Sequence, residues 1–581
     1  MLSTMHLCPE KASMVLDATL EPLLPGYAIH DVLLFVVQRF RLEASLTIPE
    51  RTTKADEMLD LASRIVEDMP LRHVPFGQRT FGLLARKLPC EQASELYTIL
   101  LRNGWRPHAN TLLHFASNFA NDRAHKTSAY EIVEALADDG MDLSNARSAS
   151  VITSLLHCKA PQDGGEDETL PFSPTETLQS LIERGFSPNV INATALVDSL
   201  CQQSEVEEAI RLALLFAECG IQLDTKTWVT VFRGAKNSLN VANVIKALEV
   251  AKAANAPYVD VLNNLLHTIF CFADAESRER HLPPPWTLPL FTPMLHIYAK
   301  KFDLEPLQWW LPDLLPAALA QKSPSQDLVA PAHGQAWAFP HSVVPVVDKI
   351  FSSGEQSRLQ PNMTTIAIML RSYIRSLRSP HDLVSSYGFF KSRLEEEGKK
   401  GRLARQLIKD QGSLIHDAFI LAMTEHQLLA RQALQVFGDM LKDHLKTGSA
   451  NARKARVENG RDVSTAPVHP CPSVLTFTIL LRGLMNRGEH ILAEQVVQLM
   501  DELGIKANLV TWNTLIKGYA SLQNVKRTVA TLQDMEAVGF HSDAFTYKAF
   551  ARLQNQAKAL KMLESIIDEN KRTMMGEGPH Q

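Results

Sequence analysis

The residues able to do chemistry are scattered along this chain, and we find none of the familiar catalytic spacings. A zinc deaminase needs H-x-E followed by P-C-x-x-C, but "GEHILAEQ" around His490 lacks that order and no cysteine pair follows it. No G-x-x-x-x-G-K-[ST], HExxH or G-x-S-x-G motif occurs. The acidic run "DGGEDE" at 163–168 lies in a Gly-rich setting, which is typical of a solvated loop. We therefore expect no catalytic residue, no metal site and no cofactor.

Composition narrows the classes further. The 581 residues are 45% apolar and 21% charged, as in globular proteins that bury a large core. Seven cysteines without a CxxC argue against a disulfide framework or a zinc module. No apolar run approaches the ~18–20 residues of a membrane span. The net charge of −5 argues against a polyanion-binding surface over the whole chain, but a local basic track stays open.

Polar and aromatic side chains do recur at a fixed interval. The phrase "VTWN" at 510–513 returns as "FTYK" at 545–548, a shift of thirty-five residues. Glycines and methionines match at the same shift. The clearest matches are threonines, each followed by an aromatic residue that we expect in the core: Thr476–Phe477, Thr511–Trp512 and Thr546–Tyr547. The chain is therefore built at least partly from repeats.

Each repeat contains two apolar patterns of helical period. In "VLTFTILLRGLMNRG" the apolar residues follow i, i+3, i+4, i+7. "HILAEQVVQLMDELGI" supplies a second stripe, and Gly504 is suited to end that helix. A helical hairpin of about thirty-five residues cannot bury both faces alone, so neighbours must stack. We predict an all-α fold, a right-handed α-solenoid of stacked hairpins, on the order of ten of them.

Composition also suggests a division of the chain. Residues 321–360 are rich in Pro, Ala and Ser, as in an insertion or hinge. Residues 442–470 are polar and basic, as in a flexible linker. The expected segments are 1–54 (helical or irregular), 55–320 (repeats), 321–360 (insertion), 361–441 (degenerate repeats), 442–470 (linker), 471–569 (repeats) and 570–581 (disordered tail).

At these residues the sequence resembles the pentatricopeptide repeat (PPR) family, whose unit reads V-V-T-Y-N-T-L-I-D-G-L…A…M…G-I-K-P-D. "LVTWNTLIKGY" from Leu509 carries most of that unit, with Met535, Gly539 and Asp543 in register. The tetratricopeptide repeat, with thirty-four residues and W-x-x-L-G-x-x-Y, fits less well. The resemblance is clearest for the units from Val190, Val474 and Leu509.

The resemblance implies binding of single-stranded RNA, one base per repeat. In this family the second residue of each unit packs against a base, and the fifth and last residues face the base edge. Carried over here, the edge pairs are Thr478 with Asn508 (adenine), Asn513 with Asp543 (uracil) and Thr194 with Asp224 (guanine). The packing residues are Leu475, Val510 and Ile191, with Phe545 closing the uracil slot. The linker residues Arg453, Lys454 and Arg456 are weaker candidates for phosphate contacts.

Two alternatives stay open for these residues. Asn508 and Asp543 precede helices, where Asn and Asp are also favoured as N-caps. The fifth positions of other units hold Val229, Ala367 and Lys548, which cannot supply the usual base-edge contacts. The expected function is occupancy of an RNA in organellar RNA metabolism, with mitochondria suggested by the family although the N-terminus is a poor transit peptide. The alternative is a protein-binding scaffold, for example in a mitochondrial ribosome or gene-expression complex.

Overall fold

The computed structural model describes residues 26–42, 48–68, 77–158, 172–279, 290–311, 358–396, 399–454 and 468–574, with a few isolated positions besides. Regular secondary structure over these ranges is helical, and one isolated β-bridge joins Phe302 to Leu359. The predicted all-α class is confirmed. None of the helices in these ranges has the length and apolar character needed to cross a membrane.

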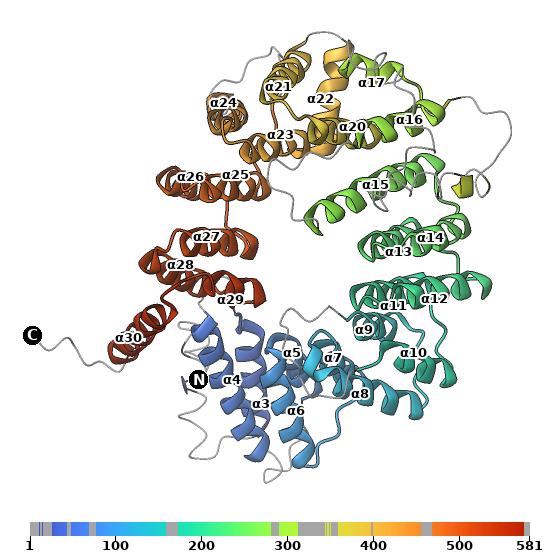
Figure 1. Ribbon diagram of the computed structural model, residues 1–581. Helices are drawn as coiled ribbons and strands as arrows, with labels where there is room; N and C mark the ends of the chain where they lie inside the picture. The colour runs from blue at the N-terminus through green and yellow to red at the C-terminus, as the bar shows by residue number, and fades with distance from the viewer. Residues whose placement is uncertain are drawn as a thin grey trace, which may run out of the picture. The chain divides into compact units, whose positions relative to one another are not determined.

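The chain divides into two compact units, one of residues 1–238 with 249–254 and one of residues 239–248 with 255–581. In the first unit, the first helices of successive hairpins pack on one another in the order α5, α7, α9, α11, α13 (Figure 1). Its helices are α3 (Gly26–Arg39), α4 (Ile48–Asp68), α5 (Gln78–Lys87), α6 (Cys90–Arg102), α7 (Ala109–Phe119), the 3₁₀ turn η3 (Arg123–His125), α8 (Lys126–Asp138), α9 (Ala146–Leu156), α10 (Pro174–Glu183), α11 (Val190–Gln202), α12 (Val206–Glu218) and α13 (Thr225–Asn237).

The second unit repeats the same arrangement, with α20, α23, α25, α27 and α29 packed in succession. α14 (Val241–Ala253) contributes residues to both units. The other helices are α15 (Tyr258–Glu279), α16 (Phe291–Lys301), α17 (Glu305–Trp310), α20 (Met363–Ser376), α21 (Pro380–Glu395), α22 (Lys399–Gln411), α23 (Leu414–Glu425), α24 (Ala430–Lys454), α25 (Val474–Asn486), α26 (His490–Glu502), α27 (Leu509–Ser521), α28 (Val525–Ala537), α29 (Ala544–Phe550) and α30 (Gln556–Met574). Each unit is therefore a stack of hairpins, as the solenoid prediction requires.

Close contact between first helices explains the repeated glycine. A Cβ built on Gly518 of α27 would lie 2.7 Å from the Cγ of Met485 on α25. The corresponding Gly234 of α13 would place its Cβ 2.5 Å from the Sγ of Cys201 on α11. No real Cβ tolerates such distances, so glycine at this position lets the two backbones approach. The core beneath α27 and α29 includes the fully buried Ile516 and Met535.

Two sequence predictions differ from the structure. The aromatic residues of the repeats were expected in the core. Phe477 is fully buried, as expected, but Tyr547 is 67% exposed. Tyr547 lies on α29, the final member of the series of first helices in the described part of the chain, so no further hairpin packs on that face. Helix α24 also continues to Lys454, so the beginning of the predicted linker 442–470 is helical.

Several predicted segments lie wholly or partly outside the described residues. These are most of 1–54 before α3, most of the predicted insertion at 321–360, the acidic run at 163–168, residues 455–467 of the linker and residues 575–581 of the tail.

Candidate nucleic-acid interface

The last position of each clear repeat caps the helix that follows it. Asn508 accepts a hydrogen bond from the Thr511 N–H (3.0 Å), and Asp543 accepts one from the Thr546 N–H (2.8 Å). Asp224 caps α13 in the same way through the N–H of Thr227 (2.8 Å). An N-cap of this type satisfies backbone donors that the helix itself cannot pair. The capping role weighed from the sequence is therefore present.

The fifth position of each repeat meets the last position at this same cap. Asn513 donates from Nδ2 to Asp543 Oδ1 over 3.0 Å, and its own Oδ1 accepts from the hydroxyl of Thr546 over 2.6 Å. In the other two units a threonine links the pair. The hydroxyl of Thr478 lies 2.8 Å from that of Thr511, which bonds Asn508, and the hydroxyl of Thr194 lies 2.7 Å from that of Thr227, which bonds Asp224. The structure thus brings all three predicted pairs together.

The pairs differ in how much of each side chain reaches the surface. Thr194 and Thr478 are only 7% exposed, and each hydroxyl also bonds a carbonyl of its own helix. Asn513 and Asp543 are half-buried. Asn508 and Asp224, the last residues of the other two pairs, are exposed. The third pair is therefore the one in which both polar side chains reach the surface.

Apolar side chains stand exposed immediately after the caps. Ile191, Leu475, Val510 and Phe545 are 62%, 56%, 62% and 71% exposed, although each is large and apolar. Three of them follow one another at the repeat spacing, on α25, α27 and α29. Single exposed apolar residues are common, but a series at one repeat position presents apolar surfaces in register along the stack, with the flat ring of Phe545 as its last member.

Basic side chains form a second series beside the first. Arg482, Lys517 and Arg552 occupy the same repeat position at the surface, and all three are exposed. Burial and their proximity lower the pKa of the middle residue, Lys517. Partial burial lowers the pKa of Lys517, and the positive charges of Arg552 and Arg482 lower it further. Among the described residues none of the three forms an ion pair. We call Arg482, Lys517 and Arg552 the basic ladder.

The basic ladder and the third polar pair share one groove. A hollow of about 510 Å³ between α25, α27 and α29 is lined by Val510, Asn513, Asp543 and Phe545 together with the basic ladder. Lys548 also lines it, with Nζ 5.9 Å from the centre of the Phe545 ring. Lys548 therefore adds a cation where the sequence suggested only a missing base contact.

Asp543 remains ionised in this groove. Burial raises the pKa of its carboxyl, but hydrogen bonds from the Thr546 N–H, the Thr546 hydroxyl, Asn513 and the Phe545 N–H outweigh it. The net effect is a pKa below the ordinary value of Asp. The groove therefore contains one fixed carboxylate beside several cations.

The corresponding surface of the first unit lacks such a ladder. The position equivalent to Arg482 is Asp198 on α11, and the next is Arg233 on α13. These two form an ion pair with 2.6 Å between Nη2 and Oδ1, and Asp198 also lies 3.5 Å from a ring nitrogen of His157. Opposite charges cancel at this repeat position, so the edge pair Thr194–Asp224 has no counterpart of the basic ladder there.

Sequence reasoning missed the basic ladder, although its signal was available as three cations spaced by one repeat. The structure says little about the three linker residues predicted to contact phosphates. Arg453 and Lys454 lie at the end of α24, where the structure describes only the backbone, and Arg456 lies outside the described residues. Those three residues stay a prediction.

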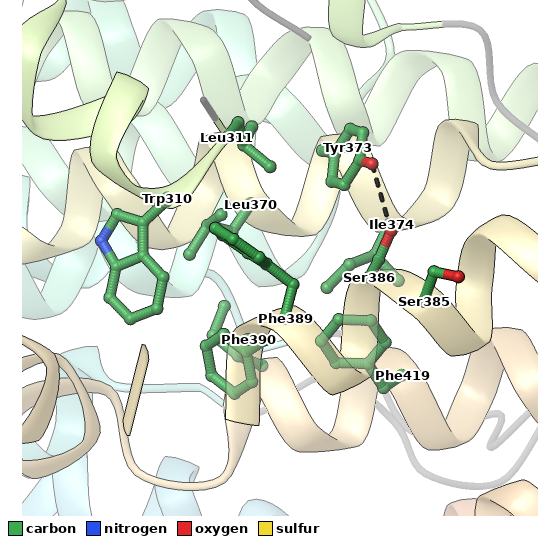
Figure 2. Close-up of a pocket in the computed structure, with 11 residues that line it drawn as sticks. Trp310, Leu311, Leu370, Tyr373, Ile374, Ser385, Ser386, Phe389, Phe390 and Phe419 are labelled. Carbon is green, nitrogen blue, oxygen red and sulfur yellow. Dashed lines mark hydrogen bonds between the residues drawn. The ribbon is translucent and has the colours of Figure 1, made fainter. Parts of the chain in front are cut away.

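A second hollow, in the middle of the second unit, has different chemistry. It measures about 280 Å³ and lies between α17, α20, α21 and α23. Figure 2 shows aromatic walls from Trp310, Phe389, Phe390 and Phe419, with a hydrogen bond of 3.1 Å between the hydroxyls of Tyr373 and Ser386 at one side. No charged side chain lines it, so it holds no cation for a phosphate.

Comparison with known proteins points to one repeat family. Residues 472–521 match the model of the PPR repeat family, and residues 510–540 match the PPR repeat. A chloroplastic pentatricopeptide repeat-containing protein of Arabidopsis thaliana is 27% identical over 114 residues, which is 19% of this chain and 14% of that protein. The chain thus spans about one-seventh of the length of the curated relative that it matches.

Two solved structures of the pentatricopeptide repeat protein PPR10 are similar at 16% identity. The first, of PPR10 from maize, is covered over 88% of its length by 96% of this chain, with a TM-score of 0.28. The second, a complex with an 18-nt psaJ RNA element, is covered over 95% by 97% of this chain, with a TM-score of 0.24.

Proposed function

We propose that this chain, whose C-terminal repeats match the pentatricopeptide repeat family, binds single-stranded RNA in the groove between α25, α27 and α29. The observation that carries the proposal is the meeting, in one hollow, of exposed side chains for stacking, a polar pair and an unpaired basic ladder. These are the three kinds of group that single-stranded RNA requires: a flat surface for a base, donors and acceptors for its edge, and cations for its backbone.

We assign one nucleotide to the part of the groove between α27 and α29. Val510 and Phe545 flank a base from two neighbouring hairpins. Between them, Asn513 and Asp543 face its edge, and the amide supplies a donor that the carboxylate holds in place. The family resemblance associates this pair with uracil. The basic ladder runs beside these positions and binds the phosphates, because three unpaired cations favour a polyanion and disfavour a neutral peptide.

The mechanism we propose is occupancy without catalysis. A strand held along the groove is shielded from nucleases and from pairing with other RNA. Because the first unit pairs Asp198 with Arg233, we assign most of the affinity to the C-terminal repeats. RNA metabolism in an organelle, with mitochondria as the first place to look, completes the proposal, and the family resemblance is its support. Imaging of a C-terminally tagged chain tests that last part.

Crosslinking of the protein to RNA in cells, followed by sequencing, tests the proposal. The matched variants are Asn513→Ala with Asp543→Asn, in which Asn at 543 still caps α29. We expect the footprint of the wild-type chain to lose its preference at one nucleotide. A full, unchanged footprint would remove the base assignment, and no footprint for either chain would favour the alternative of a protein-binding scaffold.

A further inference from the structure

We propose that Cys90, Asp122 and His125, in the first unit, form a binding site for a divalent cation of the zinc class. The site is separate from the groove that we assign to RNA. It connects the hairpin of α5 and α6 to the hairpin of α7 and α8, so the ion stabilises the stacking of two neighbouring repeats.

The three side chains come together because hairpins stack one repeat apart. Cys90 is the first residue of α6 and His125 immediately precedes α8, exactly one repeat length further along the chain. Asp122 immediately precedes η3, the short turn that ends at His125, and its side chain makes no capping hydrogen bond there. The sequence contained this signal as a cysteine and a histidine at the repeat spacing, whereas a search for local CxxC or HExxH motifs could not find it.

The distances suit a single ion. One donor atom from each residue, Sγ, a carboxylate oxygen and a ring nitrogen, lies within 4.8 Å of the others. Neighbouring ligands of a four-coordinate ion, each held at about 2.0–2.3 Å, lie about 3.3–3.8 Å apart. Side-chain rotations of about one ångström therefore close the site, and they separate His125 Nδ1 from Asp122 Oδ2, which now lie 2.6 Å apart. A thiolate, an imidazole and a carboxylate form a donor set typical of zinc, with water in the fourth position.

The surroundings fix the ligands but leave them reachable. Nδ1 of His125 lies 2.6 Å from Oδ2 of Asp122, and the imidazole packs on the ring of Phe119 with centroids 5.9 Å apart. All three ligands are partly buried. A bound dication takes the Cys90 sulfur as thiolate, and the thiol proton is released to solvent.

One positive charge lies close by and must be accounted for. Lys126 follows His125, but its Nζ donates to the carbonyls of Ala120, Ser154 and Leu155 at 3.0, 2.8 and 2.7 Å. Its ammonium is thus held by backbone acceptors and does not occupy the carboxylate of Asp122. Thiolate and carboxylate together neutralise the dication, so the site carries no excess positive charge.

Titration of the metal-free full-length chain with Co²⁺ tests the site, because cobalt reports its own ligands. We expect one equivalent to give a thiolate-to-cobalt charge-transfer band and the visible bands of a four-coordinate ion, both abolished by added Zn²⁺. The charge-transfer band disappears in Cys90→Ser, and affinity falls at least about tenfold in His125→Ala and Asp122→Asn. Cys219→Ser, which removes an exposed thiol elsewhere in the same unit, serves as the matched control and leaves the spectrum unchanged.

Each other outcome counts against the site. A band that persists in Cys90→Ser, or that is lost equally in Cys219→Ser, would overturn the assignment. Absence of any cobalt band in the folded wild-type chain would also overturn it. Circular dichroism of each variant separates loss of the site from loss of the fold, and the nearly isosteric Cys90→Ser change keeps the packing of α6.

Discussion

Replacing the basic ladder by glutamine (Arg482→Gln, Lys517→Gln and Arg552→Gln together) should weaken binding to single-stranded RNA strongly. Each phosphate contact on a single strand contributes about 0.7 to the slope of log K against log salt. Three contacts contribute about 2.1, which corresponds to a loss of about 50-fold at about 0.15 M salt, and about fourfold for a single replacement. The exposure of all three side chains makes misfolding of the variant a minor concern.

The assay is fluorescence anisotropy with an unstructured RNA of about 12 nucleotides, within the site sizes of single-strand binders. Binding is measured from about 50 to 200 mM salt, over which the ladder alone should account for an 18-fold fall in wild-type affinity, roughly. The variant should therefore show both a lower affinity and a shallower salt slope. A change in affinity without a change in slope would indicate a packing defect.

The matched control removes three exposed lysines outside the groove: Lys506→Gln, Lys526→Gln and Lys561→Gln. The net charge changes by the same amount in both triple variants. An equal loss of affinity in the control would refute a localised phosphate track, since only overall charge would then matter. Retention of the full salt slope in the ladder variant would refute it as well.

Three further predictions concern stability. Gly518→Ala should lower the free energy of unfolding by about 1–3 kcal/mol, measured by chemical unfolding, because the added Cβ clashes with α25. Gly438→Ala, whose added Cβ meets no atom within 4 Å, should not lower it. Equal losses in the two variants would contradict the packing argument. Asp543→Ala should cost about 1 kcal/mol as a lost N-cap, with Asp543→Asn near wild type, and the reverse order would contradict the cap. Complete burial lowers the pKa of His416 to about 3. The unfolded chain therefore binds more protons between about pH 6.5 and 3, so stability should fall by up to about 1.4 kcal/mol per pH unit on acidification. His416→Gln should flatten that dependence, and a wild-type profile that rises toward acid would contradict the sign.

Much of the hairpin architecture could be predicted because it is local. The period, the apolar stripes and the caps at 473, 508 and 543 all follow from neighbouring residues. The sequence also placed Asn513 and Asp543 as partners, and their side chains are in direct contact.

Contacts between hairpins were harder to predict. Asn508 caps α27, and through Thr511 it is also linked to Thr478 on the preceding hairpin. Capping a helix and facing a base are therefore compatible roles for this residue. The grouping of Arg482, Lys517 and Arg552, and of Cys90 with His125, depends on which helix faces lie together in the stack. The exposure of Tyr547 depends on where the array of first helices ends. The repeat period alone predicts neither these groupings nor the exposure of Tyr547.

The most direct test of the RNA groove is photocrosslinking of the purified chain to a 4-thiouridine RNA, with mass spectrometry of the crosslinked peptides. Binding between α25, α27 and α29 predicts crosslinks on Phe545 and Val510, reduced when Phe545 is changed to Ala and unaffected by the Lys506, Lys526 and Lys561 control. Crosslinks confined to peptides outside α25–α29, or none at saturating RNA, would contradict the account.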